Sequence, residues 1–414
     1  MQRRHFLAAG AAWSLGSMTT ARADPELARR KLVVILLRGA VDGLSVVVPY
    51  GERNYAGSRT GIALAAPGAD DGVLRLDGMF GLHPSLARLK PWWDQGALGF
   101  VHASGSPDPT RSHFDAQDYM ESGTPGRKST PDGWMNRLLA GLPGPAAPTR
   151  AINMGATPPR IFAGSAGVAS LGLGPKALDA QAIDDPRLQA AFAKLYGGTD
   201  PLARSYQDAT EGRVEIKRSM MMAAGHGTAS DTGDQGAPSA RSFAADARRL
   251  GTLIRRDPHT QLAFTSVGGW DTHVNQGGAT GQLANRLDSL GEGLDALAGG
   301  LGDAMQDTVI VVMSEFGRTL RQNGTGGTDH GRGNVMWLLG GPVAGGRMIG
   351  EWPGLDDAAL VDGRDLAVVS DFRQVLIPIL RRHLGADDAL IERVFPQAPA
   401  AAAAGSGLGK VLRA

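Results

Sequence analysis

Five short apolar runs are spaced along the chain, and glycine or a polar turn follows each of them. The runs are Lys31–Leu37, Ala97–Ala103, Gln261–Val267, Thr308–Met313 and Val335–Leu339. Uninterrupted apolar runs of this length are typical of strands that are buried on both faces of a sheet. The pattern therefore predicts five strands at the centre of the fold.

Helical patterns separate these runs. Between 283 and 301 leucine recurs at steps of three and four residues, which places an apolar stripe on one face of a helix. Further helices are predicted at 243–254, at Pro84–Trp93 and at Ser370–Arg381, the last with a kink at Pro378. Strands that alternate with helices predict an α/β fold, a three-layer α/β/α sandwich with a mainly parallel central sheet.

One internal stretch and the end of the chain depart from this alternation. We expect a single α/β domain over 24–397, with an insertion or lid at about 197–240, where three consecutive methionines and a Gly/Ser/Asp-rich stretch occur. Residues 398–414 are rich in alanine and glycine, and we expect a flexible tail there. No internal repeat of the solenoid type is found.

The first 23 residues have the pattern of an export signal peptide. Arg3 and Arg4 precede a weakly apolar run, and Ala21-Arg22-Ala23 supplies the small residues of a cleavage site. The arginine pair resembles a twin-arginine signal, which implies the twin-arginine export machinery as a partner and a periplasmic or extracellular location. An uncleaved basic N-terminus is the alternative interpretation.

Composition narrows the classes of function. The formal net charge is +1, and it becomes −2 without the first 23 residues, which hold three arginines and no acid. A near-neutral chain argues against nucleic acid as the main partner. The lack of cysteine excludes disulfides, thiolate nucleophiles and cysteine-based zinc sites. No apolar run approaches the length of a transmembrane helix.

Polar side chains with metal-binding or catalytic chemistry stand beside the predicted strands. In an open parallel sheet, ligands bind beyond the carboxyl ends of the strands. The residues at these positions are Asp42 after the first strand; Thr110, Ser112, His113 and Asp115 after the second; Asp271 and His273 after the third; Glu315 and Arg318 after the fourth; and Asp329, His330 and Arg332 before the fifth. Carboxylates and imidazoles at one sheet edge suit zinc, manganese or iron, and two such cations could clamp a phosphate-like ester.

Each of these residues also has a purely structural interpretation. Asp42 precedes glycine and fits a turn, whereas Ser112 fits the cap of a helix that starts at the next residue. Glu315 fits a salt bridge with Arg318, and the acid–histidine pairs fit hydrogen-bond networks within loops. The residues alone leave these alternatives open.

Four segments resemble the alkaline phosphatase and sulfatase superfamily. HPSLARLKPWWDQGALGFVHASGSPDPTRSHF resembles the stretch that leads to the nucleophile, and TVIVVMSEFGRT is similar to a later strand with its metal loop. TDHGRGNVMWLLGGPVAGG is similar to the last metal histidine with the next strand, and VVSDFRQVLIPILRRHLG is similar to the closing helix. Together with the leader, the chain most resembles the exported family called domain of unknown function 1501, over roughly 31–390.

The resemblance implies an alkaline-phosphatase-like sandwich with two metals. It implies that Asp271, His273 and His330 bind the first metal. It implies that Asp42 and Glu315 bind the second. The expected cofactor is accordingly a divalent metal ion, namely zinc, manganese, magnesium or calcium.

The resemblance also implies catalytic residues and shows one departure. The nucleophile would be Ser112 or, as the less favoured choice, Thr110. Arg111, Arg318 or Arg332 could orient an anionic group. Phe316 stands where the superfamily usually has a histidine, so the second metal would have only oxygen ligands, which favours a harder cation or no metal. Alternatively, the Asp329–His330 pair is the superfamily's adjacent pair, displaced by an insertion.

Two functions compete on these grounds. The first is an exported metal-dependent hydrolase of phosphate-type or related esters, small molecules or polymers, with Ser112 or a metal-bound water as nucleophile. Sulfatase chemistry is not expected, because Pro107 stands at the nucleophile position of the sulfatase motif and the chain has no cysteine. The second is a non-catalytic cell-envelope or secreted binding protein that retains the fold and acts with a secreted protein partner.

Overall fold

The computed structural model describes residues 25–155, 157–174, 186–200, 203–204, 206–207, 210, 237–399 and 407–414. The predicted signal peptide and the greater part of the predicted insertion lie outside the described residues. Within the described part of the chain, no helix has the length and apolar character needed to cross a membrane.

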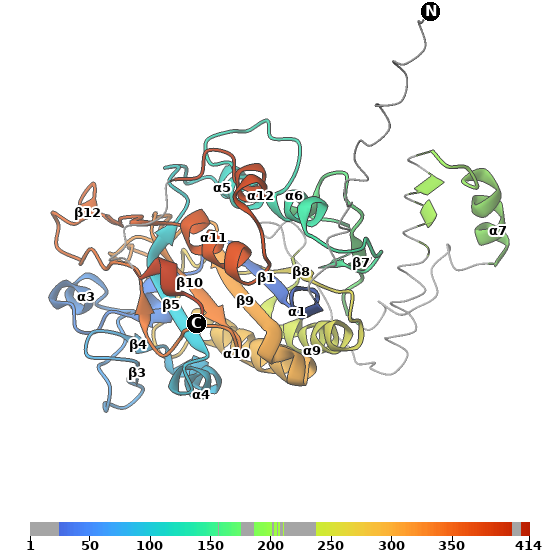
Figure 1. The fold of residues 1–414 in the computed structure, drawn as a ribbon. Helices are drawn as coiled ribbons and strands as arrows, with labels where there is room; N and C mark the ends of the chain where they lie inside the picture. The colour runs from blue at the N-terminus through green and yellow to red at the C-terminus, as the bar shows by residue number, and fades with distance from the viewer. Residues whose placement is uncertain are drawn as a thin grey trace, which may run out of the picture.

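A nine-stranded sheet forms the centre of the molecule (Figure 1). Its order is β11-β5-β10-β9-β1-β8-β6-β7, with β14 also paired to β5. The strands are β1 (Lys31–Leu37), β5 (Leu98–Gly105), β6 (Ala151–Met154), β7 (Ala169–Leu171), β8 (Leu262–Val267), β9 (Thr308–Ser314), β10 (Asn334–Leu339), β11 (Met348–Ile349) and β14 (Ser370–Asp371).

Strand direction decides which loops meet at the same edge. Strand β10 is antiparallel to both of its neighbours, β5 and β9, whereas the other pairings in this sheet are parallel. The carboxyl ends of β1, β5, β8 and β9 therefore share one edge with the amino end of β10. The loop that precedes β10 consequently lies beside the loops that follow the other four strands.

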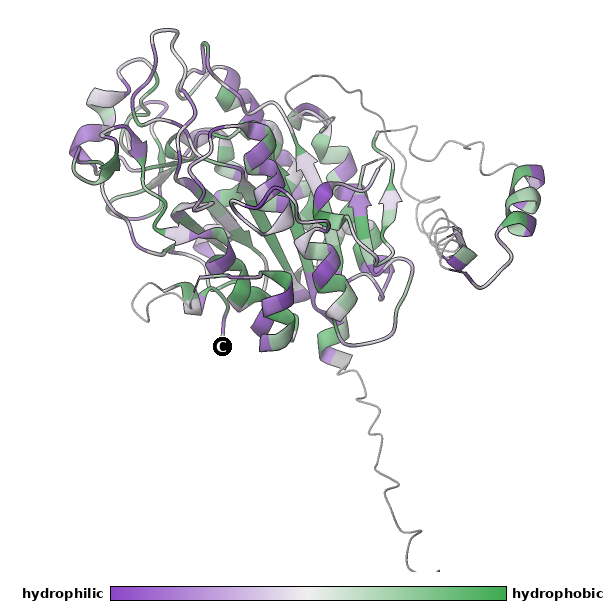
Figure 2. Ribbon diagram, turned by 90° about the horizontal axis from the view of Figure 1, so that it is seen from above, coloured by the Kyte–Doolittle hydropathy of each residue, from purple (hydrophilic) through white to green (hydrophobic). Residues whose placement is uncertain are grey.

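Helices cover both faces of the sheet, as the alternation of side chains in β1 requires. Val33, Ile35 and Leu37 belong to one buried cluster, which includes side chains of α9 (Ala240–Arg256) and α10 (Gln282–Leu301). The intervening leucines and valine belong to a second cluster with α6 (Trp134–Gly141), α11 (Phe372–Arg382) and α12 (Asp388–Val394). Figure 2 shows the hydrophobic strands enclosed between helices with hydrophilic outer faces. The fold is thus a three-layer α/β/α sandwich with a mainly parallel sheet.

Smaller elements complete the fold. A three-stranded sheet has the order β2-β4-β3 (Val47–Val48, Gly81–Leu82, Leu74–Arg75), and β12 (Leu360–Val361) pairs with β13 (Asp365–Leu366). Among the described residues, the remaining α-helices are α1 (Pro25–Arg29), α2 (Gly43–Val46), α3 (Arg53–Ser58), α4 (Lys90–Asp94), α5 (His113–Ser122) and α7 (Pro186–Leu195). The 3₁₀-helices are η1 (Pro84–Leu89), η2 (Arg160–Phe162), η5 (Gly302–Asp307) and η6 (Leu408–Lys410).

The five predicted strands are confirmed as β1, β5, β8, β9 and β10, and the leucine stripe is α10. The helix predicted at Pro84–Trp93 is divided into η1 and α4, with non-helical backbone at Leu86. Pro91 contributes to the break, because proline has no N–H for a continuous helical bond. The predicted cap Ser370 lies in β14, and Asp371 caps α11 instead through a hydrogen bond from the Arg373 N–H.

The last eight residues pack against the second cluster. Leu408, Val411 and Leu412 are buried there, and Leu412 forms a β-bridge with Val343. The prediction of a flexible tail therefore does not hold for residues 407–414. Apolar side chains near the C-terminus gain more from burial in the core than the chain loses in conformational entropy.

Candidate metal centre

Side chains from four loops meet at the sheet edge defined above. His113 is the first residue of α5, which follows β5 after a short loop. Asp271 and His273 follow β8, and Glu315 follows β9 directly. His330 lies in the loop before β10, and it reaches the same place because β10 runs in the opposite direction.

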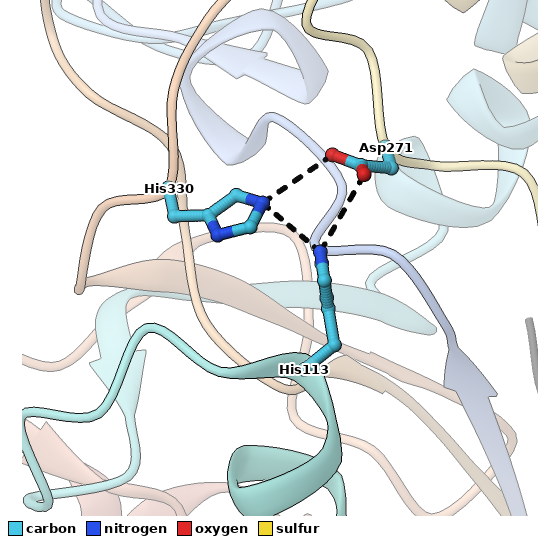
Figure 3. Close-up of side chains that lie close together, drawn as sticks. All are labelled: His113, Asp271 and His330. Carbon is cyan, nitrogen blue, oxygen red and sulfur yellow. Dashed lines mark hydrogen bonds and ion pairs between the residues drawn. The ribbon is translucent and has the colours of Figure 1, made fainter. Parts of the chain in front are cut away.

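Three imidazoles and one carboxylate converge at this edge. His330 Nε2 lies 3.0 Å from His113 Nε2 and 2.9 Å from His273 Nε2. Asp271 Oδ1 lies 3.1 Å from His273 Nε2 and 3.5 Å from His330 Nε2, and Asp271 Oδ2 lies 3.6 Å from His113 Nε2. Figure 3 shows the side chains of His113, Asp271 and His330 pointing toward one another. We call His113, His273, His330 and Asp271 together the His/Asp cluster.

The outer nitrogen of every imidazole in the cluster donates to an oxygen acceptor. The acceptors are Glu315 Oε1 for His113 (2.8 Å), Asp329 Oδ1 for His273 (3.2 Å) and the Arg111 carbonyl for His330 (2.9 Å). An ionised carboxylate or a carbonyl can only accept, so each Nδ1 must carry the proton. Each Nε2 then directs a lone pair into the cluster whenever its imidazole is neutral.

This arrangement fits a bound cation. Lone pairs that face one another at about 3 Å repel unless a proton or a metal ion lies between them. The outer hydrogen bonds fix the ring orientations in the way that is usual for metal-binding histidines. Three imidazole nitrogens and one carboxylate oxygen suit zinc or another first-row transition ion, whereas magnesium and calcium prefer oxygen ligands. The Asp271 side chain is 42 % exposed, so the cluster is open to solvent on this side.

Electrostatics show how the cluster holds positive charge. Burial lowers the pKa of His113, but hydrogen bonds to Asp271 and Glu315 and the charges of these two carboxylates outweigh it and raise the pKa to about 9. Burial raises the pKa of Glu315, but the hydrogen bond and charge of His113 hold that pKa below its usual value. In the absence of a metal, a proton on His113 therefore balances the carboxylates at neutral pH.

Arg318 supports Asp271 from inside the protein. Burial raises the pKa of Asp271, but hydrogen bonds from His113, His330 and Arg318, with the charge of Arg318, bring it far below its usual value. Arg318 Nη2 donates to Asp271 Oδ1 at 2.6 Å, and the guanidinium also donates to the carbonyls of Gly39 and Ala40. The Arg318 side chain is fully buried. It therefore orients a cluster residue from behind. The sequence suggested that Arg318 could orient an anionic substrate, but its buried donors are directed to acceptors of the protein itself.

Two predicted metal ligands point elsewhere. Glu315 Oε1 accepts from the Gly39 N–H, Gln117 Nε2 and His113 Nδ1, so this carboxylate supports His113 from behind. Asp42 is fully buried and forms an ion pair with Arg59. Both residues follow strands as predicted, but fixed donors of the protein already occupy their oxygens.

The two predicted nucleophiles have local structural contacts. Ser112 is the N-cap of α5, and its Oγ accepts from the Asp115 N–H at 3.4 Å. Thr110 Oγ1 accepts from the Ser112 N–H at 3.2 Å. Ser112 is exposed, and within the described part of the chain the hydrogen bonds of the two hydroxyls are these local ones. The helix-cap interpretation of Ser112 thus describes the structure.

Sequence reasoning did not assign two residues of the centre. The sequence places His113 in the loop after the second strand without indicating a role for it, and it offers Asp329 only as half of an adjacent acid–histidine pair. A signal for His113 exists, since a histidine directly after a helix-capping serine begins a helix at the sheet edge. Asp329 acts through His273, and a partner of this kind has no characteristic spacing.

The fold and the site define an α/β/α sandwich protein with a His/Asp cluster at the carboxyl edge of its sheet. The chain belongs to the family described as "Protein of unknown function (DUF1501)", whose model matches residues 29–395. No match to the chain was found among curated proteins.

Several solved structures are similar to this chain at low sequence identity. One is a protein in the alkaline phosphatase superfamily from Vibrio parahaemolyticus, with 11% identity, 90% of this chain and 71% of that chain covered, and a TM-score of 0.42. Another is the lipoteichoic acid synthase LtaP from Listeria monocytogenes (10% identity, 87% and 73% covered, TM-score 0.36). A third is a 2-O GAG sulfatase (11% identity, 86% and 71% covered, TM-score 0.34).

Proposed function

We propose that this chain is an exported metal-dependent hydrolase of phosphate-type or related esters. The observation that carries the proposal is the convergence of three imidazole Nε2 atoms, each with its Nδ1 held by an acceptor, on the solvent-accessible carboxylate of Asp271. His113, His273, His330 and Asp271 would hold the cation. When bound, a cation of this type polarises an ester and activates water for attack.

The residues around the cluster assign the remaining roles. Because Ser112 caps a helix and Thr110 caps a turn, we favour water over either hydroxyl as the nucleophile. Glu315 and Asp329 would keep His113 and His273 oriented with their Nε2 atoms toward the cation. The protein thus supplies a fixed ligand set and leaves the exposed side of Asp271 for substrate.

Two arginines beside the cluster fit an anionic substrate. Arg111 Nη2 and Arg364 Nε donate to the two oxygens of the buried Asp365, at 2.5 and 3.0 Å. Arg364 also donates to the carbonyl of His330, and Arg111 Nε is a donor without a hydrogen-bond partner. Two guanidinium groups share one carboxylate, so one positive charge remains in excess next to His330. Arg111, one of the three arginines considered from the sequence, and Arg364 are therefore favoured over Arg318 as the groups that would orient an anion.

The export route is part of the proposal. The arginine pair and the small-residue cleavage site of the first 23 residues support passage through the twin-arginine machinery. That pathway suits a protein that folds and loads its metal before it leaves the cytoplasm. The mature protein would then act in the periplasm or outside the cell, where polymeric anionic esters are accessible substrates.

A non-catalytic binding protein with the same metal is the second candidate. Phe316 favours it, because the ring stands where the superfamily has a histidine and packs against His113 and His330 at centroid distances of 5.0 and 5.1 Å. The phenyl ring makes this side of the cluster apolar. Such a protein would bind metal without turning over any ester.

Metal content and ester hydrolysis together test the proposal. The protein, purified without chelator or histidine tag, is expected to carry a transition metal by elemental mass spectrometry and to hydrolyse a member of a phosphomonoester and phosphodiester panel. The double variant Asp271→Ala/His330→Ala is expected to lose both the bound metal and the hydrolysis. His259→Ala, which changes an exposed histidine, is expected to keep both. Metal without hydrolysis would favour the binding protein, and a metal-free wild type that takes up none of zinc, manganese or iron would refute both.

A further inference from the structure

A buried ion pair occupies the place where the superfamily resemblance implies a second metal. Arg59 Nη1 and Nη2 donate to the two oxygens of Asp42, at 2.5 and 3.0 Å. Both side chains are fully buried. Burial by itself raises the pKa of Asp42, but the charge and hydrogen bonds of Arg59 lower it below its usual value. The carboxylate is therefore ionised and fully paired with a cation of the protein itself.

Every N–H of the Arg59 guanidinium has an acceptor. Besides Asp42, the acceptors are Ser45 Oγ (3.1 Å) and the carbonyls of Leu320 (2.9 Å) and Thr319 (3.0 Å). A guanidinium has five N–H groups, and these contacts use all of them. Arg59 is thus fixed by contacts on several sides. If a metal ion displaced Asp42, the guanidinium could not move with it without breaking its other hydrogen bonds.

Asp42 is equally occupied. Its Oδ2 also accepts from Ser45 Oγ and from Gln276 Nε2, each at 2.7 Å. A divalent cation at this carboxylate would have to displace these donors and would meet the like charge of Arg59 within a few ångströms, in a region of low dielectric where repulsion is strong. The residues present therefore do not fit a second metal.

The ion pair is joined to the loops of the His/Asp cluster. Gln276 Oε1 accepts from the hydroxyls of Thr272 and Thr328, both at 2.8 Å. Thr272 stands between Asp271 and His273, and Thr328 precedes the segment with His330. Within the part of the chain that the structure describes, the candidate metal group lies in the His/Asp cluster, at His113, Asp271 and His330, with His273 Nε2 beside it at 2.9 Å from His330 Nε2. The region around Asp42 thus supports the cluster without extending it.

We infer that the centre holds a single cation and that the guanidinium of Arg59 permanently takes the place of a second one. This inference rests on the proposed function, since it concerns the metal content of the same site. Its consequence is that an ester bound at the cluster faces one metal ion and the exposed arginines, with Arg59 and Asp42 acting only as positioning residues behind the ligand loops.

The number of bound ions tests the inference directly. The wild-type protein is equilibrated with excess zinc, and separately with manganese and calcium, and the bound metal is counted by elemental mass spectrometry. We expect one bound equivalent in the zinc and manganese samples, and no bound equivalent in the calcium sample. Two equivalents of any metal would overturn the inference and leave the proposed function intact, whereas no bound metal would overturn both.

A double substitution tests the role of Arg59 and Asp42. Asp42→Leu/Arg59→Met replaces both charges with apolar side chains, which is better tolerated than leaving one buried charge alone. We expect the folded variant, checked by circular dichroism, to keep one equivalent of zinc. Loss of zinc in a variant that remains folded would show that Asp42 is a ligand and would overturn the inference. The wild-type count decides the question independently if the variant does not fold.

Discussion

At the scale of single residues, the three histidines of the cluster differ in the acceptors that hold them. The partner of His113 is the fully buried carboxylate of Glu315, whereas the partner of His273 is Asp329, whose side chain is 55 % exposed. The partner of His330 is a backbone carbonyl, which carries no net charge. An ionised acceptor makes an imidazole a better ligand, and burial keeps that effect from being screened. Glu315 should therefore contribute most to metal affinity.

Glu315→Gln is expected to weaken zinc binding by about 10- to 100-fold, because the variant keeps an acceptor near His113 but removes its charge. Asp329→Asn should have a smaller effect, since solvent screens an exposed carboxylate. Competition with a chelator of known zinc affinity measures both changes. Asp115→Asn, a change in the first turn of α5 outside the cluster, serves as the control. Equal affinities in wild type and Glu315→Gln would contradict this role of Glu315.

Zinc affinity should also depend on pH through His113. The pKa of His113 is about 9 in the metal-free protein, so below this pH a proton occupies the Nε2 that the metal needs. Affinity is therefore expected to rise with pH, by roughly tenfold per unit between pH 7 and pH 9, and to level off above pH 9. Titration calorimetry in two buffers of different ionisation enthalpy also measures the released proton. An affinity that does not change between pH 7 and pH 9 would rule out this competition.

At the scale of elements, the cluster depends on loops that approach one another closely. A Cβ on Gly327 would lie 2.3 Å from the carbonyl oxygen of His273 and 2.4 Å from that of Thr272. Only glycine allows the loop before β10 to pack this tightly on the loop after β8. Gly324, three residues earlier in the same loop, has nothing within 4 Å of its Cβ position. Comparing substitutions at Gly327 and Gly324 therefore distinguishes the effect of close loop packing from the effect of losing the flexibility of a glycine.

Gly327→Ala is expected to lower the free energy of unfolding by about 1–3 kcal/mol and to reduce zinc affinity, because the clash must move His273 or His330. Gly324→Ala should change neither quantity by a measurable amount. Urea unfolding and chelator competition on the two variants make the comparison. Similar behaviour of the two alanine variants would show that close packing of these loops does not shape the cluster.

The sequence alone predicts those helices and strands whose own residues carry a clear pattern of apolar positions. The apolar run of β1 and the leucine stripe of α10 are correctly predicted because each pattern depends only on its own residues. Asp42 shows the limit, since a carboxylate after a strand looks the same whether it meets a metal or a guanidinium. Its partner Arg59 comes from a different segment, 17 residues later. His113 is likewise identified as a metal-ligand candidate only by the structure, because its partner His330 lies in a distant segment of the sequence.

At the scale of the whole molecule, three of the described histidines outside the cluster are buried in neutral form. His102 Nε2 donates to the Val47 carbonyl, while its Nδ1 accepts from the Ala103 N–H. His83 likewise donates to the Gly278 carbonyl and accepts from the Ser85 N–H. Protonation would therefore break a hydrogen bond and place a charge in the core. Burial lowers the pKa of His83, His102 and His383 to about 4.

These three histidines should make the fold sensitive to mild acid. Their pKa is about 6.5 in the unfolded chain and about 4 in the folded protein, so below pH 6.5 the unfolded state binds more protons. Stability is accordingly complete above pH 6.5 and falls as the pH drops toward 4, by up to about 3 kcal/mol per histidine. Thermal unfolding in excess chelator, followed by circular dichroism from pH 7.5 to pH 4.5, measures the fall without a contribution from metal release.

His102→Gln provides the matched test, because glutamine keeps a donor for the Val47 carbonyl but does not titrate. It is expected to reduce the loss of stability between pH 6.5 and pH 4.5, whatever its effect at pH 7.5, whereas His259→Ala should leave the pH profile unchanged because His259 is exposed. A profile of His102→Gln parallel to that of the wild type would show that His102 is not a source of the acid sensitivity. The acid sensitivity of the fold would then be assigned to the two remaining candidates within the described core, His83 and His383.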